Sequence, residues 1–80
     1  MHTLSTLRMV AAEIGREVMN ACVVDESLSV TIELRRISVF KKTDWLCGIQ
    51  FDLSMSDEDV LKDSRKLIEK IQNHIRSKQA

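Results

Sequence analysis

Apolar side chains recur every three to four residues in the first part of the chain. Leu4, Leu7 and Ile14 belong to this series, and most of the charged side chains between them fall on the other side of a helical projection. This period is typical of an amphipathic helix that buries one face. We therefore predict a helix over residues 4–24, ended by the polar turn 25–27.

The period then falls to two, over residues 28–40 and again over residues 45–53. Alternation of this kind indicates strands with one buried face. The polar residues 41–44 separate the two runs, and a connection of this length is typical of a β-hairpin. We predict such a hairpin, with Phe40 opposite Trp45.

This register also aligns the apolar residues farther from the turn, so that they share one face of the hairpin. The pairs that it predicts are Leu34 with Phe51 and Ile32 with Leu53. A single apolar face on the hairpin would let both helices pack against that face.

The alternation of the first strand slips at Arg35-Arg36. One interpretation is a β-bulge that returns the following apolar residues to the core. The other is that the second half of the strand has its apolar side chains on the opposite face, where they form an outward patch. We favour the second, in which the exposed interface consists of Ile37, Val39, Phe40, Trp45 and Leu46.

The last predicted helix has the clearest start in the chain. Ser56 is suited to cap it, and the acidic residues 57–59 in its first turn complement the positive helix end. Val60, Leu67 and Ile71 belong to an apolar stripe along the rest of the helix. The helix therefore packs one face against the hairpin.

These elements predict an α+β fold for residues 1–80, a single domain with the order α-β-β-α and both helices on one face of an antiparallel hairpin. A chain of this length supports only a small core. A sheet of two strands also leaves both edges unpaired and is marginally stable. We therefore expect dimerisation to extend the sheet.

The element order is similar to that of small phage head–tail joining proteins, and it loosely resembles the α-β-β-β-α plan of double-stranded-RNA-binding domains. The second family has a third strand and a basic cluster at the start of its last helix. This chain has Asp57, Glu58 and Asp59 at that position. A likeness of fold plan does not transfer function.

Composition excludes several classes of protein. The chain has 12 Lys and Arg against 12 Asp and Glu, so its formal net charge is zero, and 44% of its residues are hydrophobic. The hydrophobic share is too high for a disordered chain, and no apolar run reaches the roughly 18 residues of a membrane span. Zero net charge also disfavours a general binder of nucleic acids or membrane surfaces.

Candidate catalytic chemistry is sparse, so we expect a non-enzymatic protein without a metal, a cofactor or a small-molecule substrate. His2 and His74 stand far apart without metal-ligand spacing, and we interpret both as solvated surface residues. Cys22 and Cys47 lie in apolar surroundings and are expected to be reduced core thiols, with a disulfide between them as the alternative. The absence of a signal sequence then favours a cytoplasmic protein.

Two functional hypotheses follow. The first is a small protein-binding module, an adaptor, inhibitor or assembly factor that acts as a homodimer or on a partner protein through its hairpin surface. Aromatic and arginine side chains, which anchor many protein interfaces, gather there. The alternative is a nucleic-acid-binding regulator with a basic hairpin, whose contacts would be Arg35, Arg36, Lys41 and Lys42.

Overall fold

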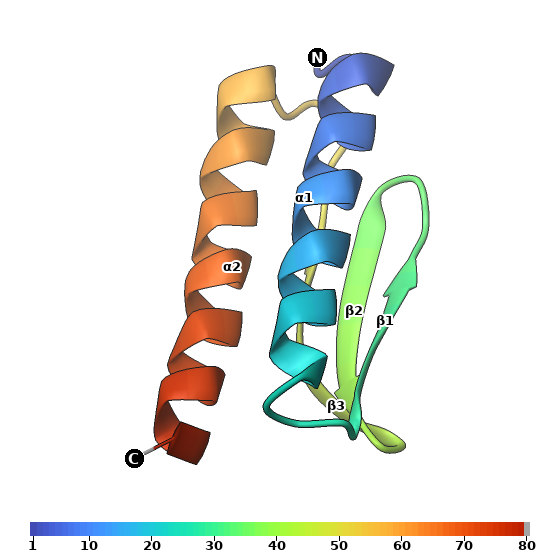
Figure 1. Cartoon of the computed structure of the whole chain (residues 1–80). Helices are drawn as coiled ribbons and strands as arrows, with labels where there is room; N and C mark the ends of the chain where they lie inside the picture. Colours follow the sequence, from blue (N-terminus) through green and yellow to red (C-terminus); the bar gives the residue numbers. More distant parts are fainter. Residues whose placement is uncertain (80) are drawn as a thin grey trace.

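The computed structural model describes residues 1–79, which form two helices and three strands. Their order is α1 (Leu4–Cys22), β1 (Leu28–Ile32), β2 (Arg36–Lys41), β3 (Asp44–Gln50) and α2 (Asp57–Gln79). The strands make one antiparallel sheet in the order β1-β2-β3. The two helices lie side by side on one face of this sheet and run in the same direction (Figure 1).

The expected α-β-β-α order is therefore corrected to α-β-β-β-α, because the predicted strand 28–40 folds back on itself. The backbone N–H of Glu33 donates to the Arg36 carbonyl at 2.7 Å, which leaves Leu34 and Arg35 as a short loop between β1 and β2. A straight strand of 13 residues would extend about 43 Å. That is well beyond the about 29 Å of a helix as long as α1, and the turn keeps the sheet under the helices.

The predicted pairing of Phe40 with Trp45 is confirmed, but the rest of the predicted register is wrong. Ile32 pairs with Ile37 of β2 and not with Leu53, and Leu34 lies in the loop. The slip at Arg35-Arg36 marks this loop and is neither a bulge nor a change of face within one strand.

A β-bulge does occur in β3. Phe40 pairs with Trp45 whereas its neighbour Val39 pairs with Cys47, so that Leu46 is the extra residue on β3. A bulge shifts the alternation of the strand by one position. As a result, Trp45 lies on the open face and Cys47 faces the helices.

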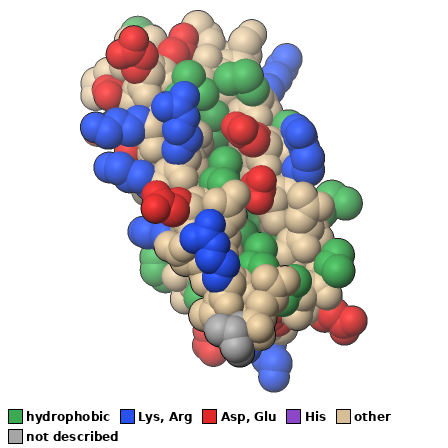
Figure 2. All heavy atoms as spheres, turned by 60° about the vertical axis from the view of Figure 1, so that its left-hand side comes forward, with side chains coloured by type: hydrophobic (Ala, Val, Ile, Leu, Met, Phe, Trp, Pro, Cys, Tyr) green, Lys and Arg blue, Asp and Glu red, His purple; other side chains and the backbone are tan. Residues whose placement is uncertain are grey.

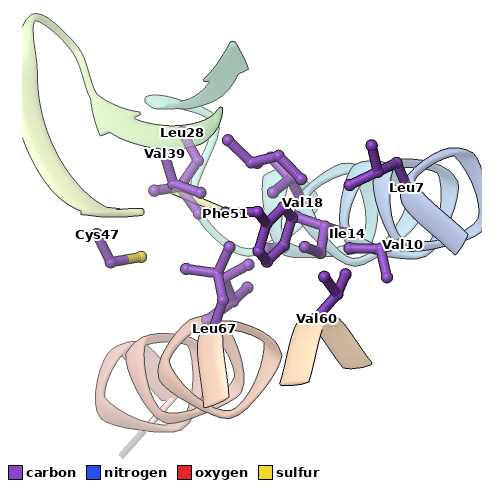
Figure 3. Packing of buried hydrophobic residues seen from close by; sticks show 13 residues of the cluster. Leu7, Val10, Ile14, Val18, Leu28, Val39, Cys47, Phe51, Val60 and Leu67 are labelled. Atoms are coloured by element: carbon purple, nitrogen blue, oxygen red, sulfur yellow. The ribbon is translucent and has the colours of Figure 1, made fainter. Parts of the chain in front are cut away.

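The core fills the space between the helices and the covered face of the sheet. Figure 3 shows Phe51 at its centre, between side chains of α1 and α2. The helices contribute their predicted stripes: Leu7, Val10, Ile14, Val18 and Ala21 from α1, and Val60, Ser64, Leu67 and Ile71 from α2. Ser64 satisfies its hydroxyl locally by donating to the Leu61 carbonyl at 2.8 Å.

The parallel helices bring their two positive N-terminal ends together, and the Asp57 carboxylate interacts with both ends. It occupies the first position of α2, where Ser56 caps the helix by accepting from the Asp59 N–H at 3.2 Å. Its Oδ1 also accepts from the backbone N–H of Thr3, the cap of α1, at 2.8 Å. This bond lowers the pKa of the Asp57 carboxyl below its usual range, and it ties the two N-termini together.

The two glycines provide a matched test of the packing. An added Cβ at Gly48 would lie 2.8 Å from the Ile37 carbonyl oxygen and 3.2 Å from Nε1 of Trp45, whereas the nearest atom at Gly15 is Cδ1 of Ile32 at 3.6 Å. We expect Gly48→Ala to destabilise the protein by about 1–3 kcal/mol. Gly15→Ala should instead stabilise helix α1 by up to about 1 kcal/mol.

Urea unfolding followed by circular dichroism measures the change in the free energy of unfolding for both substitutions. Equal effects of the two substitutions would contradict the described approach of β2 and Trp45 to Gly48.

Candidate functional site

The face of the sheet turned away from the helices is the candidate site. Cross-strand partners lie on the same face of a sheet, and the register therefore identifies its members. They are Ser29 and Thr31 of β1, Arg36, Ser38 and Phe40 of β2, and Trp45, Gly48 and Gln50 of β3. We call these eight residues the open face.

An open hollow of about 470 Å³ occupies the β2–β3 half of the open face, and Trp45 is the largest residue in its lining. The indole is 62% exposed, and its Nε1 lies over Gly48, where a side chain would collide with it. Phe40, directly opposite on β2, is half-buried beside it. Arg36, Ser38, Ile49 and Gln50 complete the lining. A large exposed aromatic beside a second aromatic is unusual for a surface that meets only water.

The open face is poor in charge. Arg36 is its single charged residue, and its guanidinium Nε lies 3.7 Å from a carboxylate oxygen of Glu33 at the end of the hairpin. The helix side differs, because Lys, Arg, Asp and Glu side chains are spread over it around the apolar ones (Figure 2). Depletion of charge together with exposed aromatics is the compositional mark of an interface centre.

Three of the predicted interface residues do not lie on the open face. Ile37 and Val39 are 2% and 0% exposed against the helices, so the prediction that they form an outward patch is wrong. Leu46, the bulge residue, is half-buried and packs against the core cluster. Of the predicted patch, Phe40 and Trp45 lie on the open face.

Arg36 was singled out only as a nucleic-acid contact, and the other open-face residues were missed. Alternation from Phe40 along β2 could have found Ser38. Alternation from Trp45 fails on β3, because the bulge at Leu46 shifts it by one position.

The four basic residues proposed as nucleic-acid contacts do not form one cluster. Arg35 lies in the loop before β2, Arg36 begins the strand, and Lys41 ends it about 17 Å from Arg36 at the usual rise of a strand. Nε of Arg35 donates to Nε2 of His2 at 3.1 Å, and Nζ of Lys41 lies 3.6 Å from Asp25. Lys42 is exposed in the turn that follows β2. The two halves of the basic set therefore face different surroundings.

Both histidines make specific contacts, contrary to the prediction that they are simply solvated. Nδ1 of His2 lies 3.0 Å from the Met55 carbonyl, and Nε2 accepts from Arg35. Accepting at Nε2 places the ring proton on Nδ1. His2 thus joins the N-terminus to the loop before α2 and to the β1–β2 loop.

The residue types of a catalytic triad meet at the end of the molecule opposite His2, but in a different arrangement. They are Asp25, Ser27 and His74. Nε2 of His74 lies 3.0 Å from Asp25 Oδ2, and the Ser27 hydroxyl donates to Asp25 Oδ1 at 2.5 Å. A nucleophilic serine has to bond the imidazole that takes its proton. Ser27 bonds the carboxylate instead, so this cluster ties the α1–β1 loop to α2.

The cysteines are both free, and neither shows the features of a reactive thiol. Burial raises the pKa of the Cys47 thiol, which keeps it protonated. Cys22 donates its thiol to the Leu28 carbonyl at 3.3 Å. Within residues 1–79, there is no group of three or more His, Cys, Asp or Glu side chains that could hold a metal ion. Neither α1 nor α2, over the same residues, is both long and apolar enough to cross a membrane.

Comparison of this chain with protein-family models, with curated proteins and with solved structures gives no match. The function is therefore inferred from the open face itself.

The Asp25 cluster predicts a pH dependence of stability. Hydrogen bonds from the side chains of Ser27 and His74 lower the pKa of Asp25 far below its ordinary value of 3.8. A carboxyl group whose pKa is lower in the folded than in the unfolded protein stabilises the fold at pH values above the unfolded pKa. This stabilisation is lost as the pH falls through 3.8 toward the pKa of the folded protein. Asp25→Asn should lower the melting temperature at neutral pH and flatten its decline in acid.

Thermal unfolding at a series of pH values tests this expectation. Asp52→Asn is the control, because it removes the same charge from an exposed side chain. If the melting temperature of Asp25→Asn fell in acid as steeply as that of the wild type, the described contacts of Asp25 would be contradicted.

Proposed function

We propose that this protein is a non-enzymatic protein-binding module whose open face receives a partner protein. The observation that carries the proposal is the exposure of Trp45 over Gly48 on a face with a single charge. Placing the indole in water on this face forgoes the burial of a large apolar side chain, worth about 1.5–3 kcal/mol. A partner that covers the hollow recovers this free energy.

The chemistry of the hollow describes the partner. Its two aromatic rings favour an apolar or aromatic side chain that inserts between them. Ser38 and Gln50, which also line the hollow, offer hydroxyl and amide groups for hydrogen bonds to a polypeptide backbone. Arg36, half of an exposed ion pair with Glu33, can exchange that weak contact for a carboxylate of the partner.

Substitution of Trp45 tests the proposal. Proteins captured on the purified chain are identified, and the affinity of each purified candidate is then measured by calorimetry. We expect Trp45→Ala to weaken the affinity for the true partner by about 30-fold or more, which is the effect of losing an interface hot spot. Gln50→Lys, which adds a charge at the hollow and keeps both aromatics, should weaken it as well.

Leu53→Ala is the matched control, because Leu53 is 60% exposed but lies in the loop between β3 and α2. It should leave the affinity unchanged, and circular dichroism should show that all variants are folded. A partner that binds the wild type and Trp45→Ala equally well would overturn the proposal.

A second candidate function is the binding of single-stranded nucleic acid to the same face. The neighbouring rings of Phe40 and Trp45 favour it, because bases stack on aromatic side chains of open sheets. Arg36 could contact a phosphate. The lack of further positive charge on the open face weighs against it, since most affinity for nucleic acids comes from phosphate contacts.

A titration with an oligothymidylate separates the two functions, with the fluorescence of Trp45 as the signal. A protein-binding module should give no change in the emission. Quenching that weakens steeply with salt and disappears in Arg36→Glu would establish the nucleic-acid function instead.

A further inference from the structure

The outer edge of β1 has unpaired backbone groups. In an antiparallel pair, alternate residues direct their N–H and C=O groups to the partner strand and away from it. Glu33 bonds Arg36, and Ser27 accepts from Lys42, so the odd-numbered residues of this segment face β2. The even-numbered residues 28, 30 and 32 face the edge.

Only part of this edge is satisfied within the chain. The N–H of Leu28 donates to the Asp25 carbonyl at 3.3 Å, and its own carbonyl accepts from Cys22. The groups of Val30 and Ile32 point outward. Figure 1 shows β1 as the margin of the sheet, and no helix or strand within residues 1–79 lies beyond it. These two residues present a short template for another strand.

The two edges of the sheet differ in their protection. β3 carries Asp44 and the bulge at Leu46, and both features hinder pairing with another strand. The sequence of β1, Leu-Ser-Val-Thr-Ile, contains no charge and no proline, and its register with β2 has no bulge. Natural sheets rarely leave such an edge in water, which indicates that the β1 edge is covered in the working protein.

The flank of α1 above this edge is apolar except for Arg8. Leu4, Arg8, Ala11, Gly15 and Met19 follow one another at helical spacing and therefore share one side of the helix. This side faces β1, because Cδ1 of Ile32 is the nearest atom to Gly15.

The same flank is also uncovered. Leu4 and Met19 are 53% and 73% exposed, and Ile32 and Leu34 below them are 43% and 56% exposed. An open groove of about 290 Å³ lies between α1 and the end of β1, lined by Leu7, Arg8, Ala11, Ile32, Glu33 and Leu34.

We propose that the occupant of this edge is the β1 strand of a second copy of this chain, and that two copies form a continuous six-stranded sheet. A twofold axis requires the two β1 strands to be antiparallel. With the axis at Thr31, Val30 lies opposite Ile32 of the partner subunit. Both residues direct their backbone groups outward, so each such pair exchanges two hydrogen bonds.

Charge complementarity supports a second copy over an unrelated strand. The twofold axis brings the start of one α1 against the end of the other. Gly15 lies near the level of the axis, because it contacts Ile32. Arg8 is about 10 Å from that level in one direction, and Cys22, in the last turn of α1, is about 10 Å from it in the other.

Arg8 therefore meets the C-terminal end of the partner's helix. The last turn of α1 contains no basic residue, and the acidic Glu26 follows it. The negative helix end and this carboxylate are a favourable site for a cation. Each copy supplies the cation that the other copy lacks, and the small side chains of Ala11 and Gly15 let the helices approach.

The dimer does not depend on the partner proposed for the open face. An axis perpendicular to the sheet keeps all four helices on one side and both open faces on the other. The dimer would thus present two Trp45 hollows on one surface.

Sedimentation equilibrium of the full chain, from micromolar concentrations upward, tests the dimer. We expect a mass of twice 9.2 kDa. Ile32→Pro should give a monomer, because it removes an outward N–H and leaves the β1–β2 hydrogen bonds intact. Trp45→Ala should remain a dimer, which separates this inference from the proposed function.

Charge reversal of Arg8, an exposed side chain, gives a second test. We expect Arg8→Glu to weaken dimerisation about tenfold, because the twofold axis places the new repulsion between the introduced carboxylate and the partner's helix end at two points of the dimer. Adding Glu26→Arg to the same chain should restore dimerisation. Arg16→Glu, the same change on α1 outside the apolar flank, should have no effect.

The inference is overturned if the wild type is a monomer throughout this range. It is also overturned if the wild type is a dimer that neither Ile32→Pro nor Arg8→Glu weakens.

Discussion

The structure depends on one constraint, which is that two amphipathic helices bury their apolar stripes on a single face of the sheet. The core residues come from those stripes and from the inward positions of three short strands, with Phe51 between the layers (Figure 3). A chain of this length has too few apolar side chains to cover the second face as well. The residues of that second face are therefore not constrained by the packing of the core.

Apart from Arg36, the residues of the open face are uncharged, and two of them are aromatic. Gly48 removes the side chain that would lift Trp45 from the sheet, and the bulge at Leu46 turns this tryptophan outward. A glycine in a strand weakens it, and an exposed tryptophan forgoes the free energy of burial. Both local costs lie at the same point of the sheet, which is where functional sites usually depart from the pattern of a stable fold.

The sequence predicted both helices, the Ser56 cap and the Phe40–Trp45 pair, because each has a local signal that tertiary packing reinforces. It failed at the third strand. Two-residue hairpin loops are recognised by glycine or asparagine, and the loop here is Leu34-Arg35. Missing that turn joined β1 and β2 into one strand, and the bulge at Leu46 was missed as well. The bulge shifts the β2–β3 register by one residue, and such a shift exchanges the two faces of a strand. Ile37 and Val39 were placed outside for this reason, while the pairing of Phe40 with Trp45, set by the second turn, was predicted correctly.

The exposure of the open face can be measured by quenching tryptophan fluorescence with acrylamide, because Trp45 is the single tryptophan of the chain. The account predicts that acrylamide reaches the indole in the folded protein with a large fraction of the efficiency it has in the chain unfolded by urea. Strong protection of the indole in the isolated folded chain would contradict the account, since it would mean that the sheet face opposite the helices is already covered.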